Sequence, residues 1–76
     1  MASYEEFQQF ADALEKALGA DFKGRVVISN DEHNKPLYVG AWVGKVNRGM
    51  EITFFPPFSA IPQCVEHVKM CDRNSS

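Results

Sequence analysis

The chain contains 76 residues, of which 45% are hydrophobic and 24% are charged. Because domains typically contain about 100–150 residues, we expect a single domain over residues 1–76, ordered from about residue 3 to residue 71. A composition this ordinary excludes a disordered or fibrous chain. A chain this short buries only about 60% of its unfolded surface, which leaves no room for a deep catalytic cleft between two lobes.

The charge is distributed unevenly along the chain. The formal net charge is −2; residues 1–22 hold five acidic residues and one basic residue, whereas residues 23–50 hold five basic and two acidic residues. Affinity for phosphate backbones comes mostly from lysine and arginine. An acidic protein is therefore a poor candidate for direct nucleic-acid binding.

The cysteines and the N-terminal residues predict a reduced, cytoplasmic protein. Cys64 and Cys71 are the only cysteines, whereas small secreted domains usually carry four or more. On one helix their Cα atoms would lie about 10.5 Å apart, beyond the roughly 7 Å limit of a disulfide. Glu5 and Glu6 stand where a signal peptide is basic, and no apolar run approaches the roughly 20 residues of a membrane span.

The first predicted element is a helix between Ser3 and Gly19. Ser3 and Glu6 form a capping box, in which each side chain satisfies an unpaired amide at the helix start. Gly19 suits the left-handed residue that ends many helices. The apolar positions recur at helical spacing and form one core-facing stripe. They are Phe7, Phe10, Ala11, Leu14, Ala17 and Leu18.

Three strands are predicted next, over residues 25–29, 37–43 and 50–55. The first is short and β-branched, and the other two alternate between apolar and other residues. Residues 47–49 (Asn-Arg-Gly) suit a tight connection, so we expect a three-stranded antiparallel meander. The face predicted to meet the core carries Leu37, Val39, Ala41, Val43, Met50, Ile52 and Phe54.

A second, shorter helix is predicted over about residues 60–71. Ser59 can cap it and Pro62 is tolerated in its first turn, while residues 72–76 are expected to fray. The element order α-β-β-β-α predicts an α+β fold. Because each helix has one apolar stripe, we expect a two-layer sandwich with both helices on one face of the sheet.

The sequence offers no constellation that predicts an enzyme, a cofactor or a metal ion. His33 could act as a general base that the Asp31 carboxylate orients, but a solvated loop histidine is the simpler interpretation. Cys64, His67 and Cys71 share helical spacing, yet the two cysteines are two turns apart and structural zinc requires four ligands. We interpret the cysteines as core residues and expect no catalytic or metal site.

An aromatic patch is the first of two candidate partner-binding surfaces. If the alternate positions of the second strand face the core, Tyr38 and Trp42 stand on the opposite face, with Phe55 across the hairpin. Exposed aromatic patches mark contacts with other molecules, and a homodimer through Trp42 is one such contact. The alternative is that Trp42 covers the bare backbone of Gly40 and Gly44.

The second candidate surface is an acidic strip on the outer side of the first helix, formed by Glu5, Glu6, Asp12 and Glu15. Its simplest interpretation is a solvated helix face. The functional interpretation is an anionic strip that occupies a positively charged groove on a partner, as a nucleic acid would, since complementary charge speeds association and selects partners.

The element order over residues 3–71 resembles that of double-stranded RNA-binding domains. That family contacts RNA with its first helix, with the loop between its first two strands and with a lysine-rich start to its last helix. The loop here holds His-Asn-Lys-Pro at residues 33–36, while the last helix starts without lysine at residues 59–63. The resemblance implies nucleic-acid binding through basic residues. The candidates are Lys23, Arg25, Lys35, Lys45 and Arg48.

In size, in its acidic strip and in its lack of catalytic motifs, the chain also resembles phage-encoded anti-defence proteins of the anti-CRISPR kind. That resemblance implies a non-catalytic inhibitor in the host cytoplasm, which covers a surface of a larger protein or nucleoprotein complex. We therefore predict a protein-binding inhibitor, with a nucleic-acid-binding domain as the alternative.

Overall fold

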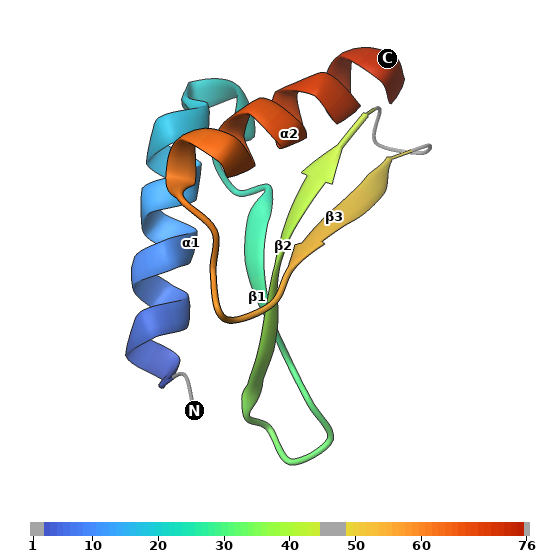
Figure 1. Ribbon diagram of the computed structural model, residues 1–76. Coiled ribbons are helices and arrows are strands. Elements are labelled where there is room, and N and C mark those ends of the chain that lie inside the picture. The colour runs from blue at the N-terminus through green and yellow to red at the C-terminus, as the bar shows by residue number, and fades with distance from the viewer. Residues whose placement is uncertain (1–2, 45–48, 76) are drawn as a thin grey trace.

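The structure is a computed structural model that describes residues 3–44 and 49–75. The predicted order α-β-β-β-α is confirmed, with one added turn of 3-10 helix, and the fold is of the α+β class (Figure 1). The elements are α1 (Tyr4–Leu18), η1 (Ala20–Phe22), β1 (Val26–Asn30), β2 (Pro36–Val43), β3 (Met50–Phe54) and α2 (Ile61–Ser75).

Helix α1 begins and ends where its sequence predicts, although within the described residues only one of the two hydrogen bonds of the predicted capping box is formed. The Ser3 hydroxyl accepts a hydrogen bond from the Glu6 amide at 3.3 Å, and Gly19 ends the helix with φ 98°, a value that favours glycine. The apolar stripe is buried except for Ala17, for which the prediction was wrong. Ala17 lies at the edge of the stripe and near the end of the helix, and its side chain is exposed.

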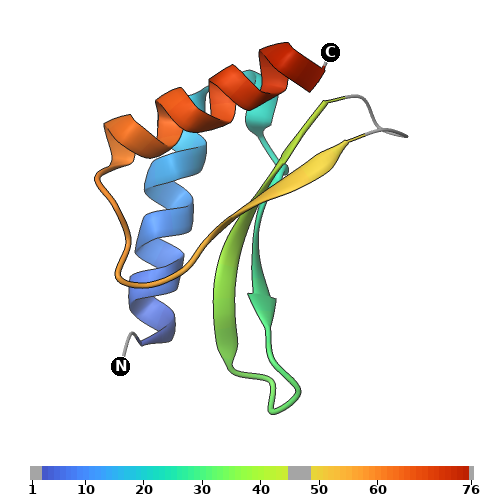
Figure 2. The ribbon, with the colours of Figure 1, turned by 45° about the vertical axis from the view of Figure 1, so that its right-hand side comes forward.

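The three strands form an antiparallel sheet in the order β1-β2-β3, as predicted. Ala41 in the central strand pairs with Val26 on one side and with Ile52 on the other. Leu37 and Met50, predicted to face the core, are exposed. Each lies at the start of its strand, and the β1–β2 hairpin extends past the start of α1 (Figure 2). The predicted connection at residues 47–49 falls mostly outside the described residues.

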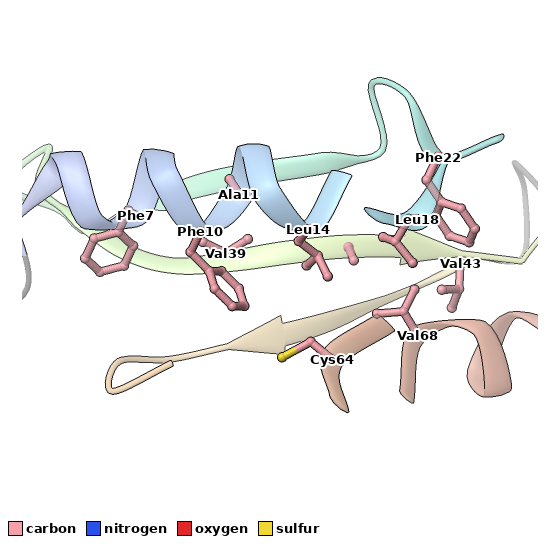
Figure 3. Packing of buried hydrophobic residues seen from close by; sticks show 11 residues of the cluster. Phe7, Phe10, Ala11, Leu14, Leu18, Phe22, Val39, Val43, Cys64 and Val68 are labelled. Carbon is pink, nitrogen blue, oxygen red and sulfur yellow. The ribbon is translucent and has the colours of Figure 1, made fainter. Parts of the chain in front are cut away.

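The core joins both helices to the central strand. Val39, Ala41 and Val43, which alternate along β2, are buried in one cluster with Leu14 of α1 and Val68 of α2 (Figure 3). This shared cluster shows that α1, α2 and the core face of β2 pack together. The expectation that both helices lie on one face of the sheet as a two-layer sandwich goes further than this contact, and it stays a prediction.

The connection between β3 and α2 also contributes to the core. Its Phe58 ring stacks on Phe10 of α1 at 4.2 Å between centroids and meets Phe7 edge-on at 5.2 Å. Aromatic pairs in these geometries stabilise a fold by more than the burial of their apolar area alone. The connection is therefore held against α1 rather than left as a free loop.

Helix α2 continues to Ser75, beyond the predicted end at about residue 71, while the fraying of residues 72–76 stays a prediction. The reason for the greater length is a polar junction at Asp72. Its Oδ1 atom accepts hydrogen bonds from the Gly44 amide at 2.8 Å and from the Arg25 guanidinium at 3.4 Å. These bonds attach the last turns of the helix to the end of β2.

Arg25 is the centre of this junction. Its guanidinium also donates to the carbonyl oxygens of Trp42, Asp21 and Gly44 at 3.0, 3.2 and 3.4 Å, and it lies 4.5 Å above the centroid of the Phe22 ring. One side chain therefore connects η1, the end of β2 and α2. A planar guanidinium with five donors suits this role, which a lysine could not fill.

We expect Asp72→Ala to lower the free energy of unfolding by about 1–2 kcal/mol, because the Gly44 amide and Arg25 lose a charged acceptor while both charged side chains are about a third exposed. A domain of this size has about 4–11 kcal/mol in total, so urea unfolding can measure the loss. Asp72→Asn, which keeps an oxygen acceptor, should lose less. The control is Glu66→Ala on the exposed side of α2; equal stability of the two alanine variants would show that the junction contributes nothing.

Candidate functional site

The face of the sheet that points away from the core carries exposed apolar side chains. We call it the open face; its residues are Val27, Ser29, Tyr38, Gly40, Trp42, Glu51 and Thr53. Trp42 is 44% exposed and Val27 is 37% exposed. Phe55, just beyond the end of β3, is 55% exposed. Large apolar side chains are thus presented to solvent along neighbouring strands.

Glu51 lies across the middle of the open face. It pairs with Trp42 in the β2–β3 register, and its carboxylate accepts a hydrogen bond from the Tyr38 hydroxyl at 2.9 Å. Between these two residues the Glu51 side chain runs over Gly40, where any Cβ atom would collide with it. Glycine at this position therefore lets the carboxylate reach Tyr38 and hold its ring in place.

The structure brings two of the predicted aromatic residues together. The Tyr38 and Phe55 ring centroids are 5.4 Å apart at an interplanar angle of 45°, while Trp42 lies four residues further along β2. The atoms nearest to the Gly40 Cβ position belong to Glu51, and the alternative that Trp42 covers the backbone of Gly40 and Gly44 stays a prediction. Trp42 is available to another molecule over 44% of its surface.

Sequence reasoning missed Glu51 and Val27 as members of this surface. The alternation of β3 places Glu51 on the same side as Thr53 and Phe55, so the sequence pattern was sufficient to predict that Glu51 belongs to this surface. Val27 could not be assigned, because the register of β1 against β2 decides which of its residues stands beside Gly40.

The acidic strip is exposed, but three of its carboxylates have neighbours. Glu5 accepts from the Gln9 amide at 3.4 Å and Asp12 from the Gln8 amide at 2.9 Å. Glu15, which is half-buried, accepts from the Gly24 backbone amide at 3.2 Å and so holds the segment after η1 against α1.

The residues considered for catalysis do not assemble into a dyad. Asp31 Oδ1 accepts from the backbone amides of His33 and Lys35 at 2.8 and 3.0 Å, so the carboxylate shapes the β1–β2 turn. The His33 ring faces Glu32 instead, with Nε2 3.4 Å from Oε1, and both side chains are exposed. This contact between two exposed side chains therefore belongs to the solvent-exposed hairpin.

Of the residues considered for metal binding, Cys71 and His67 are in contact, whereas Cys64 has a different partner. Cys71 Sγ is 3.9 Å from His67 Nε2, while Cys64 is buried with its thiol against the Ser59 carbonyl oxygen at 3.8 Å. Within residues 3–44 and 49–75, no group of three or more histidine, cysteine, aspartate or glutamate side chains is placed to hold a metal ion. Both cysteines are free thiols.

The basic residues of the nucleic-acid alternative do not form one described surface. Arg25 is occupied by the junction with Asp72, Lys23 and Lys35 are exposed, and Lys45 and Arg48 lie outside the described residues. The structure therefore assigns Arg25 a structural role and leaves two separate exposed lysines.

Comparisons with protein-family models, with curated proteins and with solved structures give no match. In the part of the chain that the structure describes, no helix has the length and apolar character needed to cross a membrane.

The two thiols should differ in reactivity. Burial raises the pKa of the Cys64 thiol, which disfavours the reactive thiolate, so iodoacetamide should modify Cys71 first and Cys64 only after unfolding.

The same pKa shift makes stability depend on pH. Because the pKa of the Cys64 thiol is higher in the folded chain than in the unfolded chain, the thiol stabilises the fold below its unfolded pKa, and this stabilisation is lost as pH rises through its folded pKa.

Mass spectrometry of digests taken during alkylation measures the order of reaction. Urea unfolding at neutral and alkaline pH, compared between the wild type and Cys64→Ala, measures the pH effect. The variant should lose less stability on the alkaline side than the wild type. Equal alkylation rates for the two thiols would contradict the burial of Cys64.

Proposed function

We propose that this protein acts by binding another protein through the open face of its sheet. The observation that carries the proposal is the exposure of Trp42 and Phe55 beside a Tyr38 ring that Glu51 holds in place. Tryptophan and tyrosine are the side chains that most often anchor protein interfaces, and a side chain already held in one rotamer loses less entropy on binding.

The apolar and acidic side chains of the open face indicate which kind of partner surface would be complementary to it. Glu51 is its only charged member among the described residues, so the complementary surface is apolar with a basic side chain near Glu51. This surface is better suited to binding than the acidic strip, because exposed ion pairs contribute only about 0–1 kcal/mol each. Burial of Trp42 removes a large apolar area from water.

Inhibition is the outcome that we propose for this binding. A domain with a principal-axis extent of 35 Å covers a patch of a larger protein or nucleoprotein complex and prevents other molecules from reaching it. Action of the anti-CRISPR type is one form of this proposal, in which the covered patch of the partner is one that would otherwise hold nucleic acid. Its support is the size of the chain, the exposed carboxylates and the exposed aromatic residues.

Affinity capture from the native host tests the binding surface. We expect Trp42→Ala to weaken capture of the partner by about 30-fold or more, the effect of losing an interface anchor. Tyr4→Ala is the matched control, because Tyr4 is an exposed aromatic residue at the start of α1, away from the open face. Circular dichroism and urea unfolding verify that both variants fold.

Salt and charge reversal separate the two candidate surfaces. Binding through the open face should persist as ionic strength rises, since it depends on apolar burial, whereas binding through carboxylates should weaken. Capture that is lost on reversing Glu5 and Asp12 but kept in Trp42→Ala would overturn the proposal in favour of the acidic strip. A concentration-dependent mass in light scattering, abolished by Trp42→Ala, would instead identify a homodimer.

A further inference from the structure

A second surface lies where the start of α1, the start of β2 and the residues after β3 meet. It is a groove of about 570 Å³, within the range of pockets that bind small molecules or single side chains. Its lining residues are Glu6, Phe7, Pro36, Leu37, Phe55, Pro56 and Pro57. Leu37 and Phe55 are 44% and 55% exposed, so the groove presents apolar surface to solvent.

The prolines determine how the groove can recognise a ligand. Proline has no backbone N–H, so the walls formed by Pro36, Pro56 and Pro57 cannot donate hydrogen bonds to an extended backbone. Recognition of a strand by main-chain pairing is therefore unfavourable here. Contact with an apolar side chain is favourable, because Leu37 and Phe55 offer exposed carbon surface.

Glu6 supplies the charge of the groove. It is the only charged lining residue, and within the described residues its carboxylate makes no hydrogen bond or ion pair; only its backbone amide is used, by Ser3. An unpaired carboxylate beside an apolar wall favours a cation and disfavours an anion. The groove is thus complementary to a ligand that joins an apolar group to a positive charge.

We propose that this groove binds an extended segment of a partner protein in which a bulky apolar side chain is followed by arginine or lysine. The apolar side chain lies against Leu37 and Phe55, and the basic side chain pairs with Glu6. The proposal rests on the proposed function in taking the partner to be a protein. Phe55 connects the two surfaces, because its ring also contacts Tyr38 at the end of the open face.

A peptide titration tests the groove without the native partner. The probe is the blocked tetrapeptide Ala-Phe-Arg-Ala, added to the isotope-labelled full chain and followed by the movement of amide resonances in NMR. We expect shifts at Glu6, Phe7, Leu37 and Phe55. Two comparison peptides, with glutamate in place of arginine or glycine in place of phenylalanine, should cause smaller shifts and bind more weakly.

Two variants assign the parts of the groove. Glu6→Gln should weaken the peptide by about two- to fivefold, the effect of one exposed ion pair, and it leaves the hydrogen bond from the Glu6 backbone amide to the Ser3 hydroxyl in place. Leu37→Thr, at an exposed strand position, should weaken it by more than about threefold. The matched control is Asp12→Asn, which removes the same charge from the same helix outside the groove and should leave the affinity unchanged.

Equal binding of the glutamate peptide, or no shift with any of the three peptides, would overturn the proposal. Shifts centred on Gly40 and Trp42 would also overturn it, because they would place the peptide on the open face. Failure of the proposed function is distinguishable, since it is measured by partner capture with Trp42→Ala, a variant that should bind the tetrapeptide like the wild type.

Discussion

The guanidinium of Arg25 connects three parts of the chain at one end of the sheet, namely η1, the end of β2 and α2. It donates to carbonyl oxygens of η1 and β2 and pairs with Asp72 of α2. A chain of this length has a small core, so directional polar contacts are needed to fix how the second helix meets the sheet. The same contacts explain why α2 remains helical to Ser75.

This structural role changes the meaning of the charge pattern. Arg25 contributes to the positive charge of residues 23–50, yet its charge is paired inside the fold. On α1, Glu15 is similarly committed to the Gly24 amide. The electrostatic surface offered to a partner is therefore smaller than the count of charged residues implies, and the unpaired Glu6 carboxylate becomes more significant.

The open face and the groove meet at Phe55, whose ring contacts Tyr38 and also lines the groove. Glu51 and Tyr38 hold the middle of the open face in a single arrangement, and Phe55 extends it toward the proline-lined groove. Both surfaces combine exposed apolar carbon with one carboxylate. A partner with apolar and basic side chains would complement both, and this shared chemistry makes one continuous interface a simpler interpretation than two independent ones.

Local sequence patterns determined the elements of this protein, because caps, turns and periodicity act within a few residues. Ser3, Gly19 and the alternation in β2 and β3 were sufficient to predict the element order, the antiparallel sheet and most of the core face. The same alternation placed Tyr38 and Trp42 away from that core. These features require no knowledge of distant contacts.

Contacts between residues distant in sequence decided the rest. The exposure of Leu37 and Met50 depends on where the helices stop covering the sheet, and the length of α2 depends on Asp72 meeting Arg25, 47 positions away. The groove exists only because α1, β2 and the residues after β3 converge at Glu6, Leu37 and Phe55. No local sequence pattern predicts these contacts, because their geometry depends on how the helices and strands pack around one core.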